Sequence, residues 1–210
     1  MEDLLESIVD EVVNRVKKEA FIEVEASGRH IHLSRKDINA LFGEGYNLTK
    51  LKDLSQPGQY ACAERVTISG PKGELKNVIV LGPERKETQV EVSLTDCSSL
   101  GLKAPIKQSG DLSNTLGVTV STDKGSITLE KGLMAAKRHV HMTPDDAKKF
   151  NVSDNEVVQV KVFGQRPLIF DDVIIRVNEN FETFMHIDYD EANACGFSKG
   201  CLARIIKNNL

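Results

Sequence analysis

Residues 26–37 read ASGRHIHLSRKD, and residues 135–146 repeat this pattern as AAKRHVHMTPDD. The two copies share the alanine, the arginine, both histidines and the final aspartate. The positions between them hold similar residues: isoleucine or valine, leucine or methionine, and serine or threonine. Chance similarity does not account for this regular agreement. The repeat therefore predicts two similar halves within one chain.

Each copy predicts a short strand followed by a short helix. Histidines alternate with apolar residues, which is typical of a strand, where successive side chains point to opposite faces. Ser34 and Thr143 then stand where a helix N-cap is expected, each with an aspartate three positions later. Pro144 occupies the first helical position, where its missing N–H is not needed.

Outside the repeat, the chain reads as one helix and many short strands. Apolar residues recur at helical spacing over residues 2–18, with acidic residues at the start and basic residues at the end. From residue 21 onward, short runs rich in β-branched residues alternate with turns such as Pro71-Lys72-Gly73. Many short strands with little helix favour a mainly β fold, either a barrel or a sandwich.

Composition excludes several classes of protein. With 27 Lys and Arg against 31 Asp and Glu in 210 residues, the net charge of −4 argues against a nucleic-acid partner. No apolar run approaches the ~18 residues of a membrane span, and the acidic first residues do not resemble a secretory signal. The four cysteines form no CxxC pair, so we expect reduced thiols in a cytosolic protein.

The histidines are the most informative side chains. In a strand, residues two apart share a face, so His30 with His32, and His139 with His141, would each direct two imidazoles to one place. His186, the only other histidine, also lies in an alternating segment. Five histidines buried in the core are the alternative, but they would not explain the pairing. Because imidazole and carboxylate are preferred zinc ligands, the pattern predicts metal binding.

Residues 85–94 predict a strand with one polar and one apolar face. The polar face consists of Arg85, Gln89, Glu91 and Ser93. The apolar face consists of Val90, Val92 and Leu94. A guanidinium beside a carboxylate suits an oxyanion held next to a metal, although a solvated strand face is equally compatible. Residues 108–113, QSGDLS, form a small-polar turn whose N–H groups could hold an anion, as in many ordinary loops.

Taken together, these segments resemble the PduL-type phosphotransacylases, also called phosphate propanoyltransferases. The similarity rests on Arg29–Ser34, on Gly82–Glu91, on Ala104–Gly110, on Arg138–His141 and on the segment around His186. It covers roughly residues 20–206. The resemblance implies an enzyme that interconverts a short-chain acyl-CoA, such as propanoyl-CoA or acetyl-CoA, plus phosphate with acyl phosphate plus CoA.

The family also implies an architecture. We expect two similar β-barrels with short helical caps and an N-terminal amphipathic helix. One barrel would combine residues 19–28 with 137–206, and the other would comprise residues 29–136 with a lid-like insertion near 43–63.

Site residues are implied by the same resemblance. Two zinc ions are expected between the barrels, although imidazole and carboxylate also accept cobalt or iron. One ion would be held by His30, His32 and Glu91, the other by His139, His141 and His186. Arg85 and Ser109 would bind phosphate and, with Glu91, form the catalytic group. Coenzyme A would contact the lid-like loop at Pro57, Gly58, Gln59 and Tyr60, and also Asn193.

Two other functions remain open from the sequence: a zinc-dependent thioester hydrolase, and a non-catalytic module that binds metal or CoA. The helix over residues 1–18 has two interpretations as well. It could be a structural cap or dimer contact, or it could be an encapsulation peptide that docks on shell proteins of a bacterial microcompartment. We favour the second, which would place the enzyme in the bacterial cytoplasm inside a microcompartment, and the family implies a homodimer.

Overall fold

The computed structural model of the protein describes residues 2–206, and the side chains of residues 6–206 except 14, 17 and 18. The helices are α1 (Glu2–Ala20), α2 (Arg35–Phe42), α3 (Leu94–Leu100), α4 (Pro144–Phe150) and α5 (Tyr189–Cys195). The first seven strands are β1 (Ile22–Ser27), β2 (His30–Ser34), β3 (Lys50–Asp53), β4 (Tyr60–Ser69), β5 (Glu74–Arg85), β6 (Gln89–Glu91) and β7 (Ile106–Lys107). The others are β8 (Leu116–Ser121), β9 (Ser126–Ala136), β10 (His139–Met142), β11 (Val157–Val162), β12 (Leu168–Val177), β13 (Phe184–Asp188) and β14 (Leu202–Ile206).

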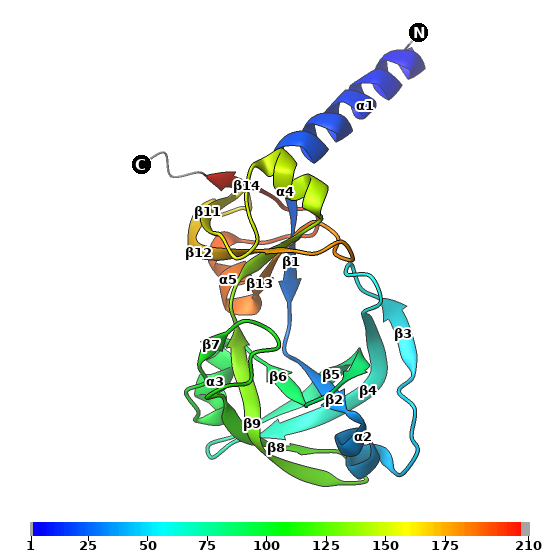
Figure 1. The fold of residues 1–210 in the computed structure, drawn as a ribbon, viewed down its shortest axis with the longest axis vertical. Coiled ribbons are helices and arrows are strands. Elements are labelled where there is room, and N and C mark those ends of the chain that lie inside the picture. The colour runs from blue at the N-terminus through cyan, green and yellow to red at the C-terminus, as the bar shows by residue number, and fades with distance from the viewer. Residues whose placement is uncertain (1, 207–210) are drawn as a thin grey trace. The chain divides into compact units, whose positions relative to one another are not determined.

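Strands from both ends of the chain close one barrel, which we call the terminal barrel. Its order is β1-β13-β10-β12-β11-β14, and β14 pairs with β1 to complete the ring. Figure 1 shows β1 in blue together with the yellow-to-red strands of this unit. Val140 and Met142, which alternate with the histidines of β10, are fully buried in its core.

Residues from the middle of the chain close a second ring, the central barrel. Here β4 pairs with β5, β5 with β2, β2 with β6, β6 with β9, β9 with β8, and β8 with β4. Strands β3 and β7 extend the sheet beside β4 and β9. Ile31 and Leu33 of β2 are fully buried in its core. The prediction of a mainly β fold with two barrels is therefore confirmed.

The two copies of the repeat form the same local structure, a strand that leads into a capped helix. Ser34 accepts a hydrogen bond from the Asp37 N–H at 3.2 Å, and Thr143 accepts one from the Asp146 N–H at 3.1 Å. These side chains satisfy N–H groups that have no partner inside the helix. The predicted caps of α2 and α4 are both present.

A threonine on a neighbouring segment completes each cap. Thr88, just before β6, donates to the Asp37 carboxylate, and Thr183, just before β13, donates to the Asp146 carboxylate. The structural repeat therefore includes β6 and β13 as well. These hydrogen bonds join the helix after each His-x-His strand to the segment that precedes β6 or β13, the strands that contain Glu91 and His186.

The N-terminal helix α1 has five exposed apolar residues among its described side chains. The side chains of Ile8, Val9, Val12, Val13 and Val16 are all between 42 and 56% exposed. Leu4 and Leu5, which the sequence assigns to the same stripe, lie outside the described side chains. In the part of the chain that the structure describes, none of the helices has the length and hydropathy needed to span a membrane.

Candidate metal and anion site

Strand pairing in the central barrel brings a histidine pair and a carboxylate together. In the antiparallel register of β2 and β6, His30 lies opposite Glu91 and His32 lies opposite Gln89. All four side chains therefore share one face, and all are at least 90% buried. One ligand atom from each of His30, His32 and Glu91 lies within 4.8 Å of the others, in a group suited to a metal ion.

The geometry around His30 suits a cation. Its Nδ1 donates to the Gly28 carbonyl at 2.8 Å, which leaves Nε2 facing Glu91 Oε2 at 3.5 Å. Two ligands about 2.1 Å from one tetrahedral ion lie about 3.4 Å apart. Burial lowers the pKa of His30, but the upward effect of the Glu91 carboxylate and of the Gly28 hydrogen bond is larger, so the pKa is raised overall. The pair thus favours a positive charge between them, either a proton or a metal ion.

Burial and neighbouring charges determine the protonation states of His32 and Glu91. Burial, together with the positive charges of His30 and Arg85, lowers the pKa of His32 to about 3. Burial raises the pKa of Glu91, but the opposing influence of His30, His32 and the Ser109 hydrogen bond brings it well below its usual range. At neutral pH the cluster therefore holds a neutral His32 and an ionised Glu91, and metal ligation requires both forms.

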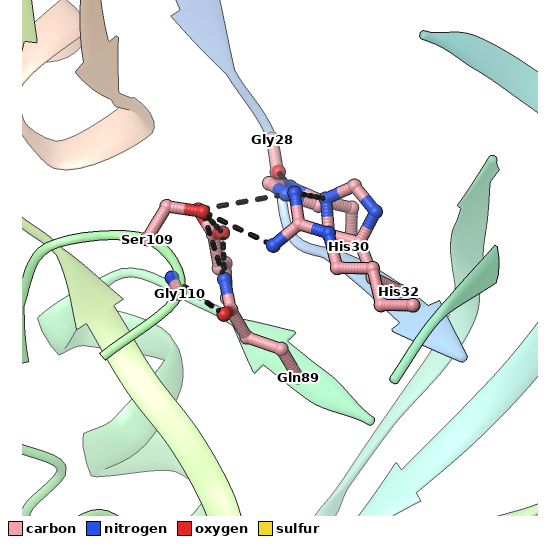
Figure 2. A network of polar contacts seen from close by, with 8 residues as sticks. Gly28, His30, His32, Gln89, Ser109 and Gly110 are labelled. Carbon is pink, nitrogen blue, oxygen red and sulfur yellow. Dashed lines mark hydrogen bonds and ion pairs between the residues drawn. The ribbon is translucent and has the colours of Figure 1, made fainter. Parts of the chain in front are cut away.

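Arg85 and Ser109 lie beside this cluster, as the sequence predicts for an anion site. Arg85 Nη2 donates to His32 Nε2 at 3.0 Å, and Arg85 Nη1 donates to Ser109 Oγ at 3.3 Å. Ser109 Oγ in turn donates to Glu91 Oε1 at 2.8 Å. Residues far apart in the sequence thus form one network, part of which Figure 2 shows.

The lid-like loop shares a pocket with these residues. The pocket has a volume of about 280 Å³ and is lined by His32, Pro57, Gly58, Gln59, Pro83 and Arg85. The loop turns at Pro57-Gly58, where Gly58 has a φ of +77°, a conformation that favours glycine. Three of the five residues expected to contact CoA therefore lie next to the candidate anion site. Tyr60, the first residue of β4, is half-buried and is not among the residues that line this pocket. Asn193 is exposed on α5 in the other unit.

The terminal barrel repeats the arrangement with three histidines. His139 lies opposite His186 in the register of β10 and β13, and His141 lies opposite Phe184. One ring nitrogen from each histidine lies within 4.8 Å of the others. Burial, together with the charges of His139 and Arg176, lowers the pKa of His141 to about 3.

The His141 ring is the clearest sign that this second cluster suits a metal. Both of its nitrogens are buried, and among the described residues neither has a hydrogen-bond partner. A buried neutral imidazole without a partner is unfavourable, whereas a metal ion would satisfy one ring nitrogen. His186 also has a carboxylate nearby, since Glu25 Oε2 lies 3.7 Å from its Nδ1.

The arginine of each repeat copy has a different partner. Arg29 pairs with Asp96 at 3.0 Å, and Arg138 pairs with Glu191 at 2.8 Å. These ion pairs join the start of each His-x-His strand to a helix, α3 in one unit and α5 in the other.

The prediction of a single strand over residues 85–94 is wrong at both ends. Arg85 is the last residue of β5, and β6 begins only at Gln89. Strand β6 ends at Glu91, and Ser93 is the N-cap of α3, where it forms a capping box with Asp96. Leu94 is the first residue of α3 and is 50% exposed, so it does not continue the apolar face. Gln89 was not among the predicted site residues. Its spacing of two residues from Glu91 places both side chains on one face of a strand and could have indicated its role.

The chain is similar to known proteins over nearly its whole length. Residues 23–198 match the family model for phosphate propanoyltransferase. The chain is 73% identical over 207 residues to the phosphate propanoyltransferase of Clostridioides difficile, a match covering 99% of both chains. It is 57% identical to that of Listeria monocytogenes, covering 98% of this chain and 96% of the relative, and 52% identical to that of Thermotoga maritima, covering 95% of each. The chain therefore belongs to the phosphate propanoyltransferase family of acyltransferases.

Proposed function

We propose that the protein transfers a short acyl group between coenzyme A and phosphate, interconverting acyl-CoA plus phosphate with acyl phosphate plus CoA. The observation that carries this proposal is the position of Arg85. Its guanidinium lies against His32 and Ser109 and lines the same pocket as the loop residues Pro57–Gln59. A fixed cation with several N–H donors, next to a hydroxyl and a candidate metal cluster, is suited to bind a phosphate dianion.

Each cluster would hold one zinc ion. His30, His32 and Glu91 would bind the first, and His139, His141 and His186 the second. Neutral imidazoles and an ionised carboxylate are the forms that ligate zinc, and three protein ligands leave a further position open. When bound, zinc would supply a positive charge that attracts the departing sulfur and stabilises negative charge at the carbonyl.

Arg85 would change partners when the site is loaded. A ring nitrogen has a single lone pair, so His32 Nε2 can serve either the Arg85 hydrogen bond or a metal ion. If that nitrogen ligates the ion, the Arg85 Nη2 N–H that donates to His32 is released and can bind phosphate. Ser109 Oγ accepts a hydrogen bond from Arg85 Nη1, so it would help to orient the guanidinium toward phosphate. Binding and orientation of this kind can supply about 7–11 kcal/mol of the barrier when two substrates meet.

The acyl group would pass directly to phosphate. A phosphate oxygen forms a bond to the thioester carbonyl carbon, the carbon–sulfur bond breaks, and CoA leaves as a thiolate. The cysteines are poorly suited to an acyl-enzyme, because Cys62, Cys97, Cys195 and Cys201 are all buried. Burial raises the pKa of each thiol, that of Cys62 to about 11, so all four stay protonated at neutral pH.

Contacts to CoA and the location of the enzyme complete the proposal. Pro57, Gly58 and Gln59 would contact CoA in the pocket, and Asn193 is a further candidate. The exposed apolar side chains of α1 would dock on shell proteins, which would place the enzyme inside a microcompartment of the bacterial cytoplasm.

The deciding experiment measures thiol release from acetyl-CoA and propanoyl-CoA with and without phosphate. We expect release to require phosphate and to yield one acyl phosphate per CoA. Arg85→Ala should lower kcat/KM for phosphate about 100-fold, the scale of losing one preorganised charged contact. Arg204→Ala, which removes an exposed arginine of β14, is the matched control. Release that ignores phosphate would identify a thioester hydrolase, and no turnover would identify a binding module.

A further inference from the structure

Gln89 has a defined orientation in the network of the central barrel. The backbone N–H of Gly110 donates to Gln89 Oε1 at 2.8 Å, and because an N–H can only donate, this contact identifies the amide oxygen. Gln89 Nε2 therefore faces the other way, where it donates to Ser109 Oγ at 3.0 Å and to Glu91 Oε1. The side chain is 1% exposed, and Figure 2 shows it between the Ser109–Gly110 turn and the histidine strand.

These contacts use the full hydrogen-bonding capacity of Ser109. Its oxygen accepts from Arg85 and from Gln89, and its single hydrogen is donated to Glu91. A hydroxyl with two acceptor positions and one hydrogen has no further direct bond to make. Gln89 thus occupies one acceptor position of Ser109 and Arg85 the other, which leaves the Ser109 hydrogen directed at Glu91.

The other half of the structural repeat shows that barrel packing does not require a glutamine here. In the register of β10 and β13, the position opposite His141 is Phe184, whereas Gln89 occupies the position opposite His32. The equivalent position in the equivalent strand pair of the terminal barrel thus accepts an aromatic ring. The polar amide is specific to the half that also holds Arg85 and Ser109.

We propose that Gln89 is a positioning residue, which holds Ser109 and the Gly110 turn against Glu91 so that phosphate meets a preformed site. This inference rests on the proposed function, and it adds a residue to the phosphate-binding machinery. Gln89 acts through Ser109 and need not touch phosphate itself. Replacing Gln89 should therefore weaken phosphate binding only as far as it disturbs Ser109.

The test is a double-mutant cycle on phosphate binding. Gln89→Met and Ser109→Ala should each raise KM for phosphate about tenfold and leave KM for acyl-CoA within twofold. The double variant should be no worse than the more severe single variant, because the two residues act through one contact. Additive effects, or a Gln89→Met variant with the KM of the wild type, would overturn the inference. Gln159→Met, on β11 of the other barrel, is the matched control.

A second measurement does not depend on turnover. In the protein without substrates, hydrogen exchange of the Gly110 amide should be slow and should speed up about tenfold or more in Gln89→Met. Gln89→Glu keeps an acceptor for Gly110 but loses both donors, so it should retain slow exchange and still raise KM for phosphate. Fast exchange in the wild type, or unchanged exchange in Gln89→Met, would contradict the assigned contact.

The two proposals fail in different ways. A wild-type enzyme whose CoA release ignores phosphate would reject the proposed function, whatever Gln89 does. Phosphate-dependent release together with additive effects would reject the role of Gln89 alone.

Discussion

At the scale of single residues, burial acts in the same direction on histidine and cysteine: it disfavours the charged form. His32 and His141 therefore remain neutral, each with a lone pair that can ligate a metal, while the thiols remain protonated. In His32 this lone pair accepts the Arg85 hydrogen bond until a metal takes its place. Glu91 is the exception, because its positive neighbours outweigh burial and keep it ionised. The same low-polarity environment thus prepares metal ligands and leaves the cysteines inert.

Cys62 should make stability depend on pH in the alkaline range. Its pKa is raised from 9.0 to about 11 in the folded protein, so from pH 9 to 11 the unfolded chain loses a proton that the folded chain keeps. Unfolding is then favoured as pH rises, by up to about 1.4 kcal/mol per unit. Urea unfolding of the wild type and of Cys62→Ala at pH 8, 9, 10 and 11 measures this effect.

The difference in the free energy of unfolding between the two proteins should shrink by about 2 kcal/mol over that range. Below pH 8 the difference should be constant, since the thiol is protonated in both states. Parallel curves from pH 8 to 11 would show that the folded environment leaves the Cys62 thiol unperturbed.

At the scale of elements, sequence periodicity predicted the strands and helix caps that are formed by residues close together in the chain. The alternation in His30–Leu33 gave a strand with one core face and one histidine face, and Ser34 was correctly assigned as a cap. The end of β6 was missed even though Ser93 and Asp96 form a capping box that can be read locally. The hydrogen bond from Thr88 to Asp37 could not be predicted, because it depends on the pairing of β2 with β6, which local sequence does not show.

Helix α1 offers a prediction at the same scale. The apolar side chains described from Ile8 to Val16 are exposed, so removing residues 1–18 should leave the barrel cores intact. We expect the truncated enzyme to keep its phosphate-dependent turnover and its melting temperature. It should no longer co-sediment with shell proteins when the two are produced together. Replacing Val9 and Val12 by serine in the full chain should have the same effect, whereas replacing the exposed Glu11 by serine should not.

The opposite result would have a clear meaning. A truncated protein that is unfolded, or that still co-sediments with the shell, would make α1 a structural cap rather than a docking helix.

At the scale of the whole molecule, the repeat gives each barrel a His-x-His strand and a third residue from the strand paired with it. That third residue differs: Glu91 in the central barrel and His186 in the terminal barrel. A divalent ion would retain a net charge of +1 with the first set and +2 with the second, because only the carboxylate is charged. The sequence showed the duplicated histidines, but only the pairing of distant strands shows that Glu91 and His186 are equivalent.

Metal content should reflect two separate clusters, one in each barrel. Elemental analysis of the purified protein should give about two metal ions per chain, since each cluster offers three ligands. Glu91→Ala and His186→Ala should each retain about one ion, and the double variant should retain almost none. Glu74→Ala, which removes an exposed carboxylate outside both clusters, should retain two. Because a ligand that binds only the folded state at 1,000 times its Kd stabilises it by about 4 kcal/mol, each lost ion should also lower the melting temperature. Loss of both ions from either single variant would show that the two clusters do not bind independently, and two ions in the double variant would place the metals elsewhere.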